Sequence, residues 1–288
     1  MLVLGFEDSD RQAAGLAAAL DAPRACIDVH RFPDGESRLR LPTSLPEHVI
    51  LCRSLHYPNE KLVELMLAAR SARALGARQI TLVAPYLCYM RQDKAFHPGE
   101  AVSQRIIGQF LAGLVDALVT VDPHLHRVHD LAAAVPVRHA VAVSAAPAMG
   151  AFLAARGSRP LLVGPDQESE QWVDTVARVA GLDYAVAQKT RRGDRNVEIR
   201  LPERDYTGLD TVLVDDLAST GRTLAGAAVA LREAGAARVD VLVTHALFVG
   251  DALETLMATG VSELWSSDSI PHASNAFALA PDLAAAIE

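Results

Sequence analysis

The fold is decided by one stretch of the chain, Thr211-Val-Leu-Val-Asp-Asp-Leu-Ala-Ser-Thr-Gly-Arg-Thr-Leu224. Its apolar run, residues 212–214, predicts a buried strand, and the alanine-rich segment after Thr223 predicts a helix. Short apolar strands alternate with alanine-rich helical segments along the rest of the chain as well. This alternation predicts α/β architecture with mainly parallel sheets.

Polar residues fill the turn between that strand and that helix: Asp215, Asp216, Ser219, Thr220, Gly221, Arg222 and Thr223. Such a turn, leading into a helix, presents backbone N–H groups and the positive end of a helix dipole, which together bind phosphate. The two aspartates end the strand, where carboxylates can accept hydrogen bonds from vicinal sugar hydroxyls. We therefore expect a site for a ribose 5-phosphate group, in which Arg222 either contacts the phosphate or points to solvent. The alternative is an ordinary capped helix, because Asp, Ser and Thr are common capping residues.

Length and composition limit the classes of protein. At 288 residues, 50% of them hydrophobic, the chain is long enough for two domains with a full core each. The net charge of −8, without a Lys/Arg-rich patch, argues against nucleic-acid binding.

No apolar run is long enough to span a bilayer, and the acidic residues from Glu7 onward do not fit a signal peptide. Cys26, Cys52 and Cys88 are odd in number and widely spaced, which is typical of a reducing compartment. We expect a cytoplasmic protein.

The sequence also indicates an internal duplication. Residues 49–85 and 212–245 each run strand, loop, helix, Gly-Ala turn, arginine and strand. We interpret the chain as two diverged copies of one α/β domain. Arg53-Ser54 then takes the place of Asp215-Asp216, so that only the second copy keeps the ribose-phosphate turn. The alternative is that such units recur in any α/β protein.

The boundary between the two copies is expected near residues 141–147, where one strand ends and a new helix begins. Pro147 suits the first turn of that helix. The predicted domains are residues 1–143 and residues 144–288.

A turn near the N-terminus, residues 31–37, carries side chains suited to a nucleotide. Phe32 can stack on a base, while Asp34 and Glu36 can accept hydrogen bonds from its exocyclic amine or from a ribose. The alternative is a simple connection between strands.

A second candidate segment, residues 85–99, follows a predicted strand directly, and loops at the carboxyl ends of strands carry ligands in open α/β sheets. Arg91 can bind phosphate oxygens through two N–H groups, and Gln92 can hydrogen-bond a nucleotide. The alternative is a solvated, charged loop.

Acidic and imidazole side chains at two further strand ends are candidate metal ligands. Asp122, His124 and His126 alternate, so in an extended backbone they point to the same side and suit a divalent cation near phosphates. Asp166 ends another strand. A structural role is the alternative for the histidine cluster.

Residues 185–193, which include Lys189 and Arg191, are predicted to be a strand that runs into a charged, glycine-containing loop, and we expect this loop to continue to about Asp205. Because Lys189 and Arg191 are two residues apart, they point the same way in an extended backbone. A mobile basic loop that closes over a polyphosphate would exclude water and stabilise developing charge. The alternative is a flexible surface hairpin with solvated charges.

Taken in order, these segments resemble the phosphoribosyl-diphosphate (PRPP) synthetase family, the ribose-phosphate diphosphokinases, along almost the whole chain. The pattern at 215–223 resembles the sugar-phosphate loop that this family shares with phosphoribosyltransferases. The run Pro85-Tyr…Tyr89-x-Arg-Gln-Asp-Lys94 resembles the family's most distinctive segment. The resemblance implies two duplicated phosphoribosyltransferase-like domains, the first for ATP and the second for ribose 5-phosphate. It also implies a closing helix, residues 281–287, which packs back on the first domain.

The resemblance implies a role for each group of candidate residues. ATP would be bound by Phe32, Asp34, Glu36, Arg91 and Gln92. Ribose 5-phosphate would be bound by Asp166, Asp215, Asp216, Ser219, Thr220, Gly221, Arg222 and Thr223. Mg²⁺ would lie near His124 and Asp122, with a second ion near Asp166. Lys189 and Arg191 would be catalytic.

The implied reaction transfers pyrophosphate from ATP to the anomeric hydroxyl of ribose 5-phosphate and gives PRPP and AMP. The expected partners are these substrates and further copies of the chain, in a homodimer or a larger assembly, with no nucleic acid and no membrane.

The chain departs from the family after Asp166, where the acidic run Gln167-Glu-Ser-Glu170 replaces small, glycine-rich residues. Carboxylates beside a phosphate repel it unless a metal intervenes. This departure keeps open the alternative of a catalytically silent regulatory subunit. A phosphoribosyltransferase is the other alternative, but it leaves the duplicated domain and the segment around Arg91 unexplained.

Overall fold

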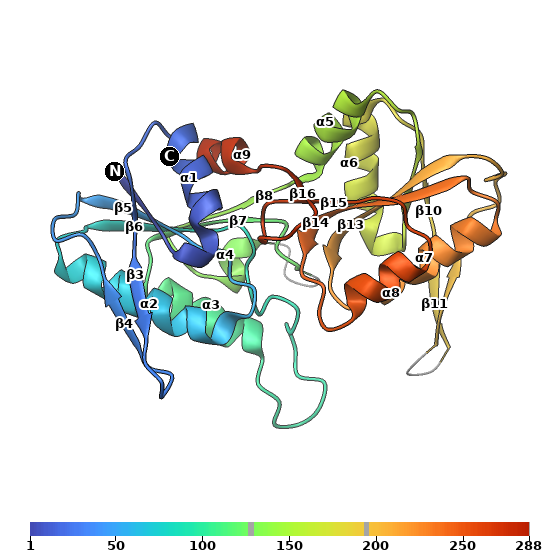
Figure 1. The fold of residues 1–288 in the computed structure, drawn as a ribbon. Helices are drawn as coiled ribbons and strands as arrows, with labels where there is room; N and C mark the ends of the chain where they lie inside the picture. Colours follow the sequence, from blue (N-terminus) through green and yellow to red (C-terminus); the bar gives the residue numbers. More distant parts are fainter. Residues whose placement is uncertain (126–129, 193–195, 288) are drawn as a thin grey trace. The chain divides into compact units, whose positions relative to one another are not determined.

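The computed structural model describes residues 1–125, 130–192 and 196–287, and the side chains of residues 190–198 lie outside this description. The chain divides into two compact units, one of Met1–Ser144 with Ala278–Glu288 and one of Ala145–Phe277. Each unit is a parallel sheet with helices on both of its faces (Figure 1).

The first unit is built on a six-stranded sheet in the order β2 (Arg24–Cys26), β1 (Leu2–Gly5), β5 (His48–Cys52), β6 (Gln79–Ala84), β7 (Ala117–Val121) and β8 (His139–Val143). All neighbouring strands are parallel. One face carries α1 (Asp10–Ala19), which follows the 3-10 turn η1 (Glu7–Ser9), and α9 (Ala280–Ala285). The other carries α2 (Pro58–Ala74) and α3 (Ser103–Ala112), and the short α4 (Leu131–Ala134) precedes β8.

The second unit repeats this plan with the order β10 (Tyr184–Val186), β9 (Leu161–Gly164), β13 (Asp210–Ala218), β14 (Arg238–Ala246), β15 (Leu264–Ser267) and β16 (Asn275–Phe277). Its neighbouring strands are again parallel. One face carries α5 (Ala146–Arg156) and α6 (Glu170–Ala180), which follows η2 (Gln167–Ser169). The other carries α7 (Arg222–Glu233) and α8 (Ala252–Ala258). The predicted duplicated α/β fold is confirmed.

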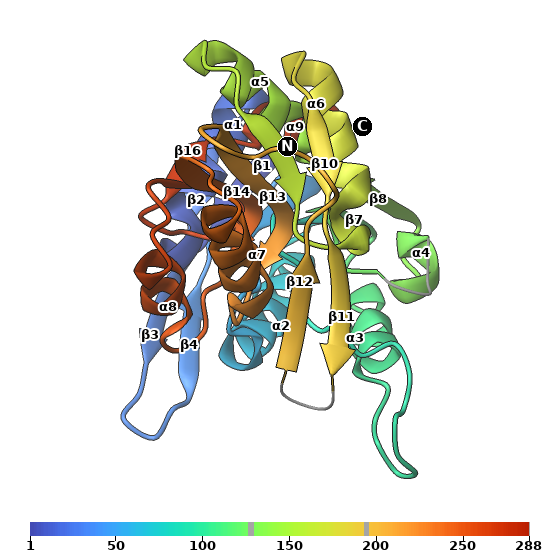
Figure 2. The same ribbon diagram turned by 90° about the vertical axis from the view of Figure 1, so that its right-hand side faces the viewer.

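Each unit also has a two-stranded antiparallel hairpin at the same point of the chain, between its second and third sheet strands. These hairpins are β3 (Asp28–Arg31) with β4 (Ser37–Arg40), and β11 (Gln188–Arg192) with β12 (Asn196–Arg200), both visible in Figure 2. The expectation of a loop continuing to about Asp205 was wrong for the residues of β12, and the alternative of a hairpin is correct. Thr190, Val197 and Ile199 favour extended backbone, because β-branched residues fit a pleated strand.

The cores lie between the sheets and their helices. The residues of β5 from Val49 to Cys52 have no exposed surface, because strands covered on both faces bury every side chain. Helices bury only one stripe, as in α6, where Val173, Val176 and Ala177 are buried three and four residues apart.

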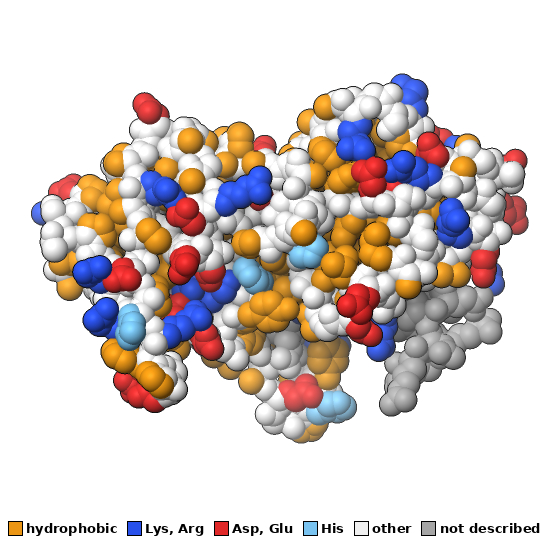
Figure 3. Space-filling view, in the orientation of Figure 1, with side chains coloured by type: hydrophobic (Ala, Val, Ile, Leu, Met, Phe, Trp, Pro, Cys, Tyr) orange, Lys and Arg blue, Asp and Glu red, His pale blue; other side chains and the backbone are white. Residues whose placement is uncertain are grey.

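On the surface, Lys and Arg side chains lie among Asp and Glu on the face drawn in Figure 3. Within the described ranges, no helix is long and apolar enough to cross a membrane.

In each unit, one helix follows in the chain the last sheet strand of the other unit. α5 follows β8 of the first unit in the chain, but it belongs to the second unit and packs against α6. α9 follows β16 of the second unit, but it belongs to the first and packs against α1. Both pairs approach closely at a glycine, because a Cβ on Gly150 would lie 2.6 Å from Val179 and one on Gly15 would lie 3.2 Å from Ala280.

Candidate functional site

The polar turn of the second unit is a strand, a tight turn and a helix in direct succession. β13 continues through Asp215 and Asp216, and α7 begins at Arg222. Gly221 is the N-cap of α7 and takes a left-handed φ of 69°. Thr220 and Arg222 are exposed. The turn therefore opens to solvent at the N-terminus of a 12-residue helix, which is the geometry of a phosphate site.

The turn is held from the side of β14. The backbone N–H of Phe248 donates to the carbonyl oxygen of Ala218 at 2.8 Å, and that of Val249 donates to the carbonyl oxygen of Ser219 at 3.0 Å. Phe248 itself has a positive φ of 33°, so this bracing segment is tightly bent. The bracing fixes the turn before any ligand arrives.

Substitution of Gly221 tests how far the turn depends on its backbone. In Gly221→Ala, the new Cβ would meet the carbonyl oxygen of Ala252 at 3.1 Å, and the positive φ would be strained. We expect a loss of about 1–2 kcal/mol in unfolding free energy from the φ alone, measured by chemical denaturation. Gly250→Ala is the matched control, because Gly250 has a φ of 65° with nothing within 4 Å of its added Cβ. Equal losses in both variants would mean that Ala252 does not constrain the turn.

Three carboxylates converge at the carboxyl ends of β9 and β13, which are neighbours in the sheet. Asp216 is buried, and Asp215 and Asp166 are half-buried. Burial raises the pKa of Asp215 well above its ordinary value, and the charges of Asp216 and Asp166 raise it further. The cluster therefore favours a cation or several hydroxyl donors beside it.

Lys189 of β11 joins this group. Its Nζ donates to Oδ2 of Asp166 at 3.1 Å and to the hydroxyl of Thr223, in the first turn of α7, at 3.0 Å. The second unit thus brings the predicted lysine, an acid and the phosphate turn together. The backbone of Arg191 also lies in β11, but its side chain is outside the described part of the chain.

The acidic run after Asp166 forms the 3-10 turn η2 and the start of α6. Oδ1 of Asp166 accepts the backbone N–H of Glu168 at 3.1 Å, and its carbonyl oxygen accepts the hydroxyl of Ser169 at 2.6 Å. Gln167, Glu168 and Glu170 are exposed. The carboxylates of Glu168 and Glu170 are therefore hydrated, which weakens their repulsion of a bound phosphate.

The nucleotide candidates of the first unit begin with the tip of the β3–β4 hairpin. Phe32 is 40% exposed, and Asp34 and Glu36 are exposed. The turn is closed by a 2.8 Å hydrogen bond from the N–H of Phe32 to the carbonyl oxygen of Glu36, and Oδ1 of Asp34 accepts the N–H of Glu36 at 3.1 Å. The aromatic ring and both acids thus stand on one ordered tip.

Arg91 and Gln92 lie in the loop after β6. Arg91 is exposed. Oε1 of Gln92 accepts the hydroxyl of Ser103 at 2.9 Å, which fixes that side chain to the start of α3. Its amide nitrogen is the end suited to contact a ligand acceptor.

Asp122 and His124 follow β7, the neighbour of β6, so both segments begin at the same edge of the sheet. Asp122 is buried with a φ of 34°, and its N–H donates to the carbonyl oxygen of Val143 at 2.9 Å. His124 is half-buried, and His126 lies outside the described residues. Among the described residues, no three His, Cys, Asp or Glu side chains form a ready metal site.

A buried ionic cluster in the first unit stands where the second unit has its paired acids. β5 pairs with β6 from His48 opposite Gln79, and β13 pairs with β14 from Asp210 opposite Arg238. Counted from these first paired residues, Arg53 takes the position of Asp215, as the sequence pattern predicts. The Arg53 guanidinium is 2% exposed and lies 3.1 Å from Asp8 and 2.6 Å from Glu64. A buried charge must be paired, and here Arg53 is paired within a closed ionic network at the position of Asp215.

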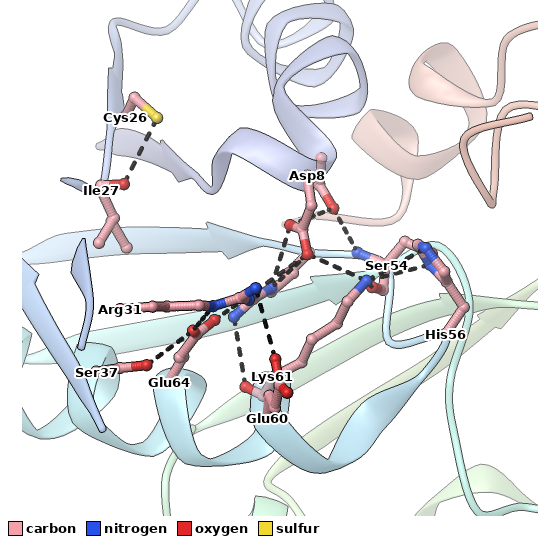
Figure 4. Close-up of polar contacts among 12 residues, drawn as sticks. Asp8, Cys26, Ile27, Arg31, Ser37, Ser54, His56, Glu60, Lys61 and Glu64 are labelled. Carbon is pink, nitrogen blue, oxygen red and sulfur yellow. Dashed lines mark hydrogen bonds and ion pairs between the residues drawn. The ribbon is translucent and has the colours of Figure 1, made fainter. Parts of the chain in front are cut away.

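Lys61 and His56 complete this cluster, as Figure 4 shows. Lys61 lies 3.1 Å from Asp8 and donates to the carbonyl oxygen of Ser54 at 2.9 Å. The sequence analysis did not predict this ionic cluster. Its only signal in the sequence was one arginine, Arg53, and one lysine, Lys61, next to apolar segments.

The titration of His56 reports the integrity of the cluster. Burial, reinforced by the Lys61 charge, lowers the pKa of His56 from 6.5 to about 4. The unfolded state therefore binds its proton more tightly, and the unfolding free energy should fall as pH decreases from 6.5 to about 4. Thermal melts of His56→Gln should lack that part of the decline, whereas melts of His139→Gln, an exposed control, should keep it. An NMR midpoint near 6.5 for His56 would contradict this prediction.

The fold and the turn define the class: two phosphoribosyltransferase-like domains in one chain, the second with a sugar-phosphate turn. A family model for the N-terminal domain of ribose phosphate pyrophosphokinase matches residues 1–114, and one for the phosphoribosyl transferase domain matches residues 141–255. The ribose-phosphate pyrophosphokinase of Methanopyrus kandleri is 36% identical and aligns over 100% of this chain and 99% of its own length. This chain belongs to the ribose-phosphate pyrophosphokinase family.

Further comparisons agree. The ribose-phosphate pyrophosphokinase of Methanothermobacter thermautotrophicus is 31% identical, with 98% of each chain covered. The crystal structure of phosphoribosylpyrophosphate synthetase from Mycobacterium smegmatis superposes with a TM-score of 0.81 at 24% identity, covering 99% of this chain and 96% of that one. The superposition supports the two-domain fold.

Proposed function

We propose that this chain transfers the pyrophosphoryl group of ATP to the anomeric hydroxyl of ribose 5-phosphate and releases AMP. The observation that supports this best is the contact of Lys189 with both Asp166 and Thr223. A cation, a strand-end acid and a phosphate-binding helix start therefore meet beside a pair of sugar-binding acids. Full-length relatives named ribose-phosphate pyrophosphokinase support the same activity.

In this proposal the second unit binds ribose 5-phosphate. Asp215 and Asp216 accept hydrogen bonds from the vicinal hydroxyls, and Asp166 contacts the sugar side as well. Burial is the largest cause of the raised pKa of Asp215, and repulsion from Asp216 and Asp166 adds to it. Hydrogen bonds from the sugar hydroxyls would offset both effects. The phosphate binds at the turn and the helix start, through Ser219, Thr220, Gly221, Arg222 and Thr223.

The first unit binds ATP. Phe32 stacks on the adenine, and Asp34 and Glu36 accept from its exocyclic amine or from the ribose. Arg91 binds phosphate oxygens through two N–H groups, and Gln92 donates its amide to the nucleotide. The exposure of the hairpin tip and of Arg91 leaves these groups accessible.

The donor chemistry of both units fits Mg²⁺, which takes oxygen ligands and keeps waters and substrate phosphates in its shell. Asp166 would hold one ion, since its neighbours Asp215 and Asp216 make that place favourable for a cation. Asp122 and His124 would hold another. When bound, Mg²⁺ neutralises charge on the transferring phosphates.

Transfer needs positioning and charge stabilisation more than covalent catalysis. The anomeric oxygen attacks the β-phosphorus, the bond from that phosphorus to the α-phosphate oxygen breaks, and AMP leaves with the electron pair while the hydroxyl proton passes to solvent. Lys189 and Arg191 stabilise the equatorial oxygens. A ligand at Asp166 would compete for the carboxylate and free Lys189 for this task.

Phosphorus NMR of the protein with Mg²⁺, ATP and ribose 5-phosphate tests the proposal. We expect the ATP signals to decline while AMP and the diphosphate of PRPP appear together. Unchanged ATP would indicate a silent regulatory subunit. Pyrophosphate release from added PRPP and a base, without ATP, would indicate a phosphoribosyltransferase.

We also propose a homodimer or a larger homo-oligomer, since symmetric association is the common outcome for soluble enzymes, and a cytoplasmic site of action in keeping with a biosynthetic role. Light scattering of the purified chain measures the assembly. A monomer at micromolar concentration would contradict it.

A further inference from the structure

One buried carboxylate of α2, that of Glu64, reaches the β3–β4 hairpin. The side chain is 1% exposed. Its Oε1 accepts from Nε of Arg31 and from the hydroxyl of Ser37, each at 3.1 Å. Figure 4 shows both residues turned toward Glu64 from the hairpin strands. The contacts join positions 33 and 27 residues apart, so they fix the hairpin to the body of the unit.

The two contacts fall at the base of the hairpin tip. Arg31 and Ser37 are opposite each other as the last paired residues before the turn. The next hydrogen bond, from Phe32 to Glu36, closes the turn itself. Glu64 therefore holds both strands at the point from which the tip projects.

The carboxylate is itself anchored from the core. Oε2 of Glu64 lies 2.6 Å from Arg53, whose guanidinium also pairs with Asp8 and stacks 4.0 Å above the ring of Phe6. Burial acts to raise the pKa of Glu64, but hydrogen bonds from Arg31 and Arg53 hold it below its ordinary value. Glu64 is therefore a charged, pure acceptor with one oxygen for the core and one for the hairpin.

An isolated two-stranded hairpin is marginally stable in water, so a projecting tip needs an anchor to keep its side chains in place. We infer that Glu64 is a positioning residue for the nucleotide base, which fixes the tip carrying Phe32, Asp34 and Glu36 through Arg31 and Ser37. The inference rests on the proposed function, in that the tip is the adenine site. Preorganisation of this kind improves affinity and selectivity for the base and leaves the transfer step untouched.

The test removes the hairpin side of the contact and leaves the buried pair of Glu64 and Arg53 intact. In the double variant Arg31→Met, Ser37→Ala, calorimetry should give a Kd for Mg-ATP about tenfold higher, the factor that corresponds to about 1.4 kcal/mol. KM for ATP should rise equally, with kcat and KM for ribose 5-phosphate unchanged. The preference for ATP over GTP should also fall, because a loosened tip reads the base less well. A merely structural role would instead lower the unfolding temperature and leave the base preference intact.

Glu60→Gln is the matched control. Glu60 lies on the same helix one turn earlier and pairs with the same Arg31 at 3.5 Å, but it is 74% exposed. We expect its ATP affinity and base preference to match those of the unaltered protein. Glu64→Gln, if it folds, should reproduce the double variant.

If Phe32→Ala raises the Kd for Mg-ATP but the folded double variant leaves it unchanged, the inference about Glu64 fails and the proposed function stands. Failure of the unaltered protein to release AMP would overturn the proposed function, and the calorimetric comparison would still decide the role of Glu64. An equal loss in Glu60→Gln would also overturn the inference, because it would assign the effect to Arg31 and the helix surface.

Discussion

Lys189→Ala should lower kcat by about 10²- to 10³-fold, the size of effect that follows removal of one preorganised donor to a developing charge. KM for ribose 5-phosphate should change little, because we propose that the turn and the paired acids hold that substrate. The structural reason is that Lys189 reaches Asp166 and Thr223 from a strand of its own, and so lies beside the proposed sugar-phosphate site. Steady-state kinetics with each substrate varied in turn measure both quantities.

Arg204→Ala is a suitable control for Lys189→Ala. Arg204 follows the same hairpin and pairs with Asp183 on the surface at 2.7 Å, so its loss removes a charge without touching the turn. Lys189→Arg should recover part of the rate. A near-normal turnover number for Lys189→Ala would remove this lysine from the mechanism.

Asp215→Asn should raise KM for ribose 5-phosphate by about 10- to 100-fold, because a hydrogen bond to a charged acceptor contributes about 1.5–3 kcal/mol. The free protein, in contrast, should become more stable. Burial and two neighbouring carboxylates disfavour the ionised form of Asp215, and the amide carries no charge. A site built for a ligand commonly lowers the stability of the empty protein in this way.

The direction in which the unfolding free energy changes with pH follows from the raised pKa of Asp215. The folded state binds the Asp215 proton more tightly than the unfolded state, because burial raises its pKa. The unfolding free energy therefore falls as pH rises from the ordinary aspartate range through the raised pKa. At pH 8, Asp215→Asn should melt higher by about 2–4 °C for each kcal/mol of repulsion removed. Asp210→Asn, an exposed position on the same strand, should melt unchanged, and a lower melting temperature for Asp215→Asn would contradict the argument.

The sequence predicted what is local or periodic. The turn after β13 was predictable because its strand, its polar residues and its helix are consecutive, and a helix start is a common phosphate-binding geometry. The place of Arg53 was predictable from repeated spacing alone, and the strand register agrees. Both predictions needed only neighbours in the chain or a comparison of the two halves.

Long-range polar contacts were beyond that reasoning. Glu64 lies on a helix where a charge usually faces solvent, and its contact with Arg31 joins residues 33 apart. The contact of Lys189 with Thr223 spans 34 residues. Such pairs depend on how the hairpins pack against the helices, and no local sequence pattern predicts that packing. The hairpin of β11 and β12 was only the alternative interpretation, because the charges of that segment outweighed its few β-branched residues.

The return of α9 to the first unit bears on how the chain could be cut and rejoined. A protein ended at Ser144 would lack α9 and leave Ala13, Leu16 and Ala17 of α1 without the helix that belongs to their unit. Moving residues 278–288 ahead of Met1 would place α9 before β1, just as α5 precedes β9. The circular permutant would be a tandem array of two contiguous repeats, each beginning with its own helix. In these terms the native termini lie inside one repeat.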